Sequence, residues 1–283
     1  MPRNSFIFKF QVLVLCFFFL TSCNPSANIL KNLSAKTSDE AMYEDALKLV
    51  DTQDYAGAIS KILATTASFQ TNTTVKQTLA GAYAGKCGLV FLTFVKNLSG
   101  ATGAPLSFLM SAFTSVTVSP SDCYLAQTTT ESTFGSTSSA RGTDTNFFLA
   151  VLGMVKIGTY LRASADTNQD GVVDTVATVP SLSADYDSCN SSSISDANVI
   201  QVGTGLGLIL DNLAAISSSL SGTSSTGFAT LQTACALITP NPCTITDPNS
   251  ANWTATTIKA IRSVIKSNTF GIESCALGLL CCP

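Results

Sequence analysis

Oxygen-bearing residues alternate along one short stretch of the chain, residues 166–174. Alternating side chains can bring their oxygens to one point, and Gly171 allows the sharp turn that this requires. A hard cation such as calcium takes six to eight oxygen ligands. The stretch is therefore our candidate metal site, and an ordinary polar turn in an exposed loop is the alternative. The candidate ligands are Asp166, Asn168, Asp170, the backbone carbonyl of Val172, and Asp174.

The order Asp-x-Asn-x-Asp-Gly-x-x-Asp in this stretch resembles the calcium loops of EF-hands and dockerins. The resemblance implies a structural calcium ion that ties the loop between two helices. One departure is Ala177, which stands at the twelfth position in place of Glu. The bidentate carboxylate is therefore missing unless Asp185 or Asp187 supplies it.

The charge around this stretch also favours a cation. Residues 163–258 contain no Lys or Arg. Eight carboxylates without a basic neighbour in sequence would be stabilised by a bound positive charge. They are Asp166, Asp170, Asp174, Asp185, Asp187, Asp196, Asp211 and Asp247.

A second stretch with chemical meaning lies near the N-terminus. Arg3 and Lys9 precede an apolar run, Val12 to Leu20, which is about half the roughly 20 residues that a membrane-spanning helix needs. This is the pattern of an export signal. The run ends in Leu20-Thr21-Ser22-Cys23, which resembles the processing box of bacterial lipoproteins.

The lipoprotein resemblance implies the location of the protein. In that family the signal peptide, here residues 1–22, is removed, and Cys23 becomes a lipidated N-terminus carrying acyl chains such as palmitate. Asn24 follows, where Asp often marks retention in the inner membrane. We therefore expect a lipid anchor in the outer membrane, on its periplasmic face. An ordinary cleaved signal is the alternative.

The remaining cysteines indicate disulfides. Of the ten cysteines, Cys16 lies in the signal and Cys23 takes the lipid, which leaves an even number in an exported protein. Metal ligation is the weaker alternative because no CxxC spacing occurs. The shortest pairing, Cys235–Cys243, spans Pro240-Asn241-Pro242, and the adjacent Cys281 and Cys282 should pair elsewhere. The candidates are Cys87, Cys123, Cys189, Cys235, Cys243, Cys275, Cys281 and Cys282.

Helical spacing of apolar residues predicts an all-α fold stapled by disulfides. After a tether, residues 23–37, the domain begins at Ser38 and extends to residue 283. We expect helices at about 38–51, 55–63 and 74–98, a mobile Ser/Thr/Gly-rich loop at 127–145, a helix capped by Asn146, and further helices at about 195–216, 227–238 and 251–267. Three glycines, Gly203, Gly205 and Gly207, lack the GxGxxG order of a nucleotide loop, and the pair Gly203 and Gly207 fits close helix packing better.

Residues 38–98 resemble the tetratricopeptide repeat, a helix–turn–helix unit of 34 residues. Residues 53–59 match its inter-helix pattern, and Ala46 recurs as Ala80, 34 positions later. This resemblance implies repeat-like helical hairpins, and a generic antiparallel helix pair is the alternative.

Composition limits the function. The chain has no histidine, which excludes Ser-His-Asp and Cys-His catalysis. Removing residues 1–22 takes two of the 15 basic residues and none of the 18 acidic ones, so the net charge becomes −5 and nucleic acid is not expected as a partner.

We predict no catalytic residue, although Glu131 or Glu273 could act as an acid or base. The leading hypothesis is a non-enzymatic binding or scaffold protein with a protein partner; the alternative is a small-molecule carrier lipoprotein associated with a periplasmic transport system.

Overall fold

The chain folds into helices. A computed structural model describes residues 37–99, 103–212, 223–276 and 280–282. These residues contain eleven α-helices, two short 3-10 helices and no β-strand, which confirms the predicted all-α class. The predicted signal peptide, Cys23 and most of the predicted tether lie outside the described residues.

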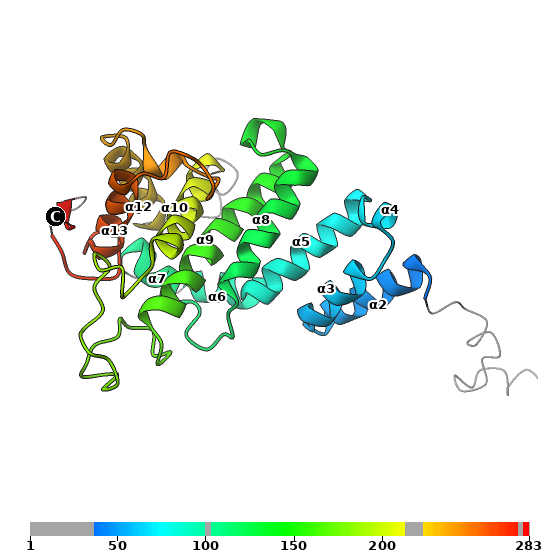
Figure 1. Cartoon of the computed structure of the whole chain (residues 1–283), viewed down its shortest axis with the longest axis horizontal. Coiled ribbons are helices and arrows are strands. Elements are labelled where there is room, and N and C mark those ends of the chain that lie inside the picture. Colours follow the sequence, from blue (N-terminus) through cyan, green and yellow to red (C-terminus); the bar gives the residue numbers. More distant parts are fainter. Residues whose placement is uncertain (1–36, 100–102, 213–222, 277–279, 283) are drawn as a thin grey trace, which may run out of the picture.

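Three helices, α2 (Asp39–Asp51), α3 (Tyr55–Leu63) and the short α4 (Ala67–Gln70), form one end of the molecule (Figure 1). The Ser38 hydroxyl accepts a hydrogen bond from the Ala41 backbone N–H and caps α2, and the Asp54 carboxylate caps α3 in the same way at Gly57. Ala46 and Ala58 are fully buried in a small core of their own. The hairpin therefore forms as predicted, and its identity as a tetratricopeptide repeat stays a prediction.

The predicted helix 74–98 is two helices, α5 (Thr73–Cys87) and α6 (Phe91–Ser99). The break lies at Gly88, whose φ of +134° is a conformation that side chains other than glycine rarely adopt. Gly88 thus ends α5 and turns the chain toward α6.

The prediction of a mobile loop over residues 127–145 is wrong. After α7 (Pro105–Ser111), the helix α8 (Pro120–Phe134) covers residues 127–134 of that segment, and a 3-10 turn, η3 (Ser138–Ala140), follows it. The hydroxyls of Thr128, Thr130 and Thr133 donate to backbone carbonyls four residues earlier, so these polar side chains are satisfied within the helix. The Ser/Thr-rich composition is therefore compatible with a helix here.

The central helix is α9 (Thr143–Ala165), which packs against α7, α8 and α10. It begins before Asn146, so the predicted cap is wrong: the Asn146 amide instead donates to the Ser138 carbonyl and its oxygen accepts from Arg141 Nε. Every residue from Leu149 to Leu161 is buried. Among the described helices α9 is long and apolar enough to cross a membrane, but most of its surface is covered by protein.

Helix α10 (Asp196–Asp211) lies against α9, followed by α12 (Thr223–Cys235), η4 (Pro242–Thr244) and α13 (Ala255–Lys266). A Cβ atom on Gly153 of α9 would lie 2.7 Å from the Gly205 carbonyl of α10, and one on Gly205 would lie 2.7 Å from Ile157. The two backbones approach this closely only because both residues are glycine. The close packing predicted for Gly203 and Gly207 is also present, because a Cβ there would lie 2.5 Å from Trp253 and from the Ile245 carbonyl, respectively. Helices α12 and α13 lie at the end of the molecule opposite α2 (Figure 1).

All eight disulfide candidates are paired. The bridges are Cys87–Cys123, Cys189–Cys282, Cys235–Cys243 and Cys275–Cys281. The short Cys235–Cys243 pairing is thereby confirmed, as is the expectation that Cys281 and Cys282 pair with other residues. The first bridge joins α5 to α8, and the second ties the C-terminal tail to the segment before α10.

Candidate functional site

The predicted calcium loop follows α9 directly. Asp166 is fully buried at the end of that helix, and its carboxylate accepts hydrogen bonds from the backbone N–H groups of Asp170 and Gly171, at 2.9 and 3.1 Å. Gln169 and Gly171 both have positive φ, which folds the loop back over Asp166. The loop is thus a built turn around a buried carboxylate, and the expectation that it is exposed is wrong at this residue.

A second buried carboxylate, Asp174, closes the loop. Its Oδ2 accepts from the Thr167 backbone N–H at 2.8 Å and from the Thr167 hydroxyl at 2.5 Å, while its Oδ1 is buried and has no hydrogen-bond partner. Burying an acceptor without a partner costs free energy. This orphaned oxygen fits a bound cation.

The other candidate ligands, Asn168, Asp170 and Val172, form hydrogen bonds to one another and not to Asp166 or Asp174 through their side chains. The Asn168 amide donates to Asp170 Oδ2, and Asp170 Oδ1 accepts from the Val172 backbone N–H, so these three residues interact with one another. Within the described residues no three carboxylate or thiol groups converge to hold a metal ion as they stand. A cation at Asp166 and Asp174 would require Asp170 to turn toward them.

Some of the carboxylates in residues 163–258 have basic neighbours in space, contrary to the prediction from the sequence. Three of the eight carboxylates of residues 163–258 do have basic partners from outside that segment: Asp187 pairs with Lys266, Asp196 with Arg262, and Asp211 with Arg141. Asp185 remains beside the loop, where its Oδ1 accepts from the Val176 backbone N–H. Four of the five carboxylates without such a partner among the described residues therefore lie in or against the loop.

The nearby carboxylates affect the pKa of Asp166. Burial raises the pKa of its carboxyl; the two backbone N–H groups act against that rise, and the nearby Asp170 and Asp174 carboxylates add to it. A cation in the loop would reverse this effect, because it would stabilise the ionised form.

A buried lysine, which the sequence analysis did not single out, lies at the centre of the core. Lys156 of α9 has no exposed surface; its Nζ donates to Gln127 Oε1 at 2.9 Å and lies 5.7 Å from the centre of the Tyr124 ring. The Gln127 amide in turn donates to Glu131 Oε1 at 3.1 Å and to the Thr246 carbonyl at 2.8 Å. As the only charged residue between Phe147 and Leu161, Lys156 could have been noticed in the sequence.

Burial lowers the pKa of Lys156 to about 7, and the carboxylates of Glu131 and Asp247 oppose that shift. Burial also raises the pKa of Glu131, which the hydrogen bond from Gln127 partly offsets. Lys156 cannot reach solvent in this conformation, and Asp247 is exposed, so the group forms no open cleft for a substrate. The other possible acid, Glu273, lies elsewhere, where it accepts from the Ser188 backbone N–H.

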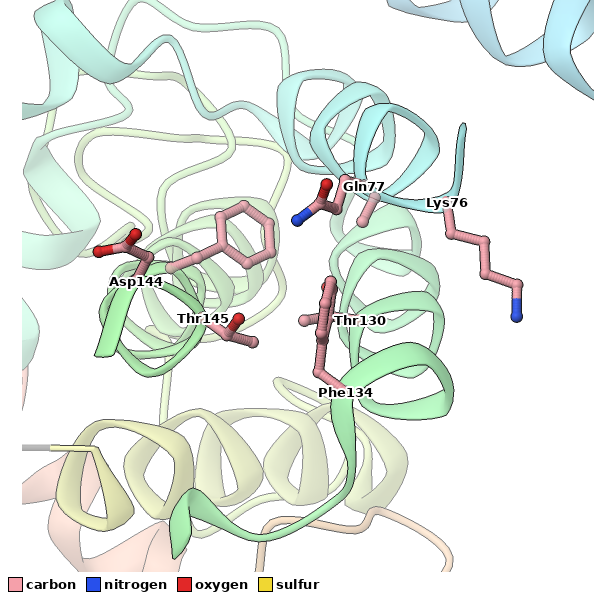
Figure 2. A pocket seen from close by; sticks show the side chains of 8 residues that line it. Lys76, Gln77, Thr130, Phe134, Asp144 and Thr145 are labelled. Atoms are coloured by element: carbon pink, nitrogen blue, oxygen red, sulfur yellow. The ribbon is translucent and has the colours of Figure 1, made fainter. Parts of the chain in front are cut away.

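The candidate binding site is a pocket of about 220 Å³ between α5, α8 and α9 (Figure 2). No sequence pattern predicted it, because its three walls come from segments far apart in the chain. Figure 2 shows Gln77 and Thr145 turned toward the space between the helices and Lys76 and Asp144 turned outward. The lining residues are Lys76, Gln77 and Ala80 of α5, Thr130 and Phe134 of α8, and Asp144, Thr145 and Phe148 of α9.

A second hollow, of about 620 Å³, lies at the C-terminal end. Ile238, Ala255, Lys259 and Leu280 are among its lining residues. Leu280 adjoins residues 277–279, which are outside the described part of the chain, whereas the residues that line the first pocket have no such neighbours.

Comparisons of the chain with protein-family models, with curated proteins and with solved structures found no match.

Proposed function

We propose that the protein is a non-enzymatic, lipid-anchored binding protein on the periplasmic face of a bacterial outer membrane, and that its helical body binds a protein partner. The observation that carries the binding role is the pocket between α5, α8 and α9, which opens at the surface and whose lining residues all belong to described helices. The anchor rests on Leu20-Thr21-Ser22-Cys23.

The runner-up is a carrier of small molecules. A carrier is expected to enclose most of its ligand in an apolar cavity, and drug-sized ligands occupy roughly 300–1,000 Å³. The pocket between α5, α8 and α9 is smaller than that and has polar and charged residues at its mouth, although the second hollow, of about 620 Å³, falls within the range. These features favour a protein partner, which covers a surface and inserts single side chains.

Two carboxylates in a shared cleft would favour an enzyme. In the part of the chain that the structure describes, Glu131 bonds Gln127 and Glu273 bonds Ser188, so the two are held by different neighbours. Glu273 instead shares Lys266 with Asp187, so the two glutamates considered as acid and base do not pair with each other.

We also propose a structural calcium ion in the loop of residues 166–174. The orphaned Oδ1 of buried Asp174 and the lack of a basic partner for Asp166, Asp170 and Asp174 among the described residues support it. The ion would be held by Asp166, Asp170 and Asp174, with Asn168 and the Val172 carbonyl as further oxygens, and would join the end of α9 to the segment leading to α10.

The anchor and the binding role have separate tests. The Cys23→Ser protein should leave the membrane fraction and lose metabolic labelling by a palmitate analogue; if it stays membrane-bound after a high-salt wash, the anchor is wrong. For the binding role, intact envelopes containing the wild-type protein are treated with a crosslinker, and adducts are identified by mass spectrometry. We expect a defined protein adduct; a co-purified small organic molecule without any protein adduct would favour the carrier.

A further inference from the structure

We propose that the pocket between α5, α8 and α9 receives one uncharged aromatic side chain, which a protein partner presents, and that polar groups at the mouth bind the adjacent peptide group. This inference rests on the proposed binding function and names the chemistry of its site.

The size of the pocket points to a single ring. An apolar protein cavity of about 150 Å³ is large enough to bind benzene. The pocket, at about 220 Å³, has room for one ring and the carbon that carries it, but not for a drug-sized ligand.

The walls of the pocket favour an aromatic occupant. Phe134 of α8 and Phe148 of α9 both line it and are both only partly buried. The aromatic pairs in the described residues are Tyr43–Phe69 and Phe94–Phe113, so neither pocket ring has an aromatic neighbour there. A third ring entering between them could make the edge-to-face or offset contacts, with centres about 4.5–7 Å apart, that aromatic rings prefer.

The polar groups at the mouth suit a peptide group. The side chains of Gln77 and Thr145 make no hydrogen bond to other described residues, and Gln77 offers both a donor and an acceptor. No side chain caps the first turn of α9, so backbone N–H groups on the same wall are also available to a carbonyl. The Thr130 hydroxyl donates to the Ala126 carbonyl and keeps its acceptor capacity.

The charges favour a residue within a chain over a free, ionised metabolite. Lys76 and Asp144 stand on opposite walls, make no ion pair among the described residues, and point away from the cavity (Figure 2). The interior therefore offers no charge to a free carboxylate or ammonium group, and burying either without a partner is costly. An aromatic residue inside a polypeptide has neither group.

The test uses the purified full-length protein in detergent and N-acetyl-phenylalaninamide, a capped aromatic residue, as the probe. Binding is followed by chemical shifts of the pocket residues in nuclear magnetic resonance spectra. We expect saturable shifts at Gln77 and Thr145, and binding tighter than that of N-acetylglycinamide or free zwitterionic phenylalanine. Absence of shifts at the pocket up to the solubility limit of the probe would overturn the inference, and so would equal binding of the glycine analogue.

Two variants test the location. Phe134→Ala removes one ring, and Thr145→Trp places a bulky ring in the mouth without removing a hydrogen bond of the described residues. Each should weaken binding of the probe roughly tenfold, which corresponds to about 1.4 kcal/mol. Phe91→Ala is the matched control, since the Phe91 ring is 46% exposed on α6 and does not line the pocket. Unchanged binding by both pocket variants would contradict the assignment.

Crosslinking of envelopes separates failure of this inference from failure of the proposed function. If Thr145→Trp recovers the same partner as efficiently as the wild type, the binding function stands and the pocket is not its site. If free phenylalanine binds as tightly as the capped probe, the site belongs to a small-molecule carrier, and the partner assignment is overturned. Loss of the adduct in Thr145→Trp, with the adduct kept in Phe91→Ala, supports both.

Discussion

Lys156 is an ionisable residue placed where ionisation is costly. It lies in the stretch of α9 from Leu149 to Leu161, where every residue is buried, with one hydrogen-bond acceptor, Gln127 Oε1, and the face of the Tyr124 ring nearby. A neutral amine, which has two hydrogens to donate, suits this environment better than an ammonium group, which has three. With a pKa of about 7, Lys156 changes its charge near neutral pH. The chain has no histidine, the residue that usually does so.

This predicts a pH-dependent stability. The pKa of Lys156 is about 7 in the folded protein and 10.5 in its ordinary state, so between these values the unfolded chain binds more protons than the folded one. The free energy of unfolding therefore rises with pH from about 7, by at most about 1.4 kcal/mol per unit. Below about pH 7 both states are protonated, and the contribution of Lys156 no longer changes.

Melting temperatures between pH 7 and 9 check this prediction. The wild type should gain stability over that range relative to Lys156→Met, whereas Lys259→Met, which removes an exposed lysine, should behave as the wild type. Parallel pH profiles for the wild type and Lys156→Met would show that the buried amine does not titrate there.

Asp166 and Asp170 should behave differently in the calcium loop. Asp170 is exposed, so Asp170→Asn should abolish a calcium-induced rise in melting temperature while changing the calcium-free value little. Asp166→Ala removes a buried acceptor of two backbone N–H groups, so it should also destabilise the calcium-free protein, by about 1–3 kcal/mol.

The measurement is thermal unfolding with and without about 5 mM calcium. With few side-chain ligands and no bidentate Glu, we expect a dissociation constant on the order of 10⁻⁴–10⁻³ M, and stabilisation then grows with the logarithm of calcium concentration. Magnesium serves as the comparison ion and should act more weakly. A wild type indifferent to calcium would leave residues 166–174 as a polar turn.

At the scale of elements, the contact between α9 and α10 depends on glycine. Gly205→Ala would push a methyl group against Ile157 and the Gly153 carbonyl, and such overpacking typically costs about 1–3 kcal/mol. Gly81→Ala is the matched control, because a Cβ there would meet no atom within 4 Å. That exposed position in α5 should instead gain about 0.5–1 kcal/mol. Urea unfolding of both variants measures the difference, and a neutral Gly205→Ala would refute the close approach.

Local signals were the reliable part of the sequence. Ser38 caps the first helix of the domain, where the sequence predicts that helix to begin. The cap that Asp54 provides for α3 was not predicted. At α8 the composition led to a wrong prediction, because Ser/Thr-rich segments usually form loops. Here the hydroxyls donate to carbonyls within the helix, and the helix packs on α5. The pocket could not be predicted from the sequence for a related reason: Gln77, Phe134 and Thr145 come together only because three helices pack against one another.

At the scale of the whole molecule, the bridge between Cys189 and Cys282 spans 93 residues, whereas that between Cys275 and Cys281 spans six. A crosslink restricts the unfolded chain more when the loop it closes is longer. Replacing Cys189 and Cys282 by Ala should therefore cost up to about 4–5 kcal/mol, against about 2 kcal/mol for Cys275 and Cys281. Denaturant unfolding of the two double variants gives the comparison; a larger loss for the short loop would contradict this ranking.

The described bridges all lie between Cys87 and Cys282, and α2 to α4 pack around a small core of their own without any bridge. This gives the molecule a mechanical asymmetry. With Cys23 held in a membrane and a partner pulling on the body, tension enters at α2, and residues 37–86 contain no covalent crosslink to resist it. These 50 residues would span about 170 Å when fully extended. The same tension acts on the bridged body, but its disulfides limit how far it can extend, so the unbridged N-terminal helices would lengthen first and lower the force between the membrane and the partner.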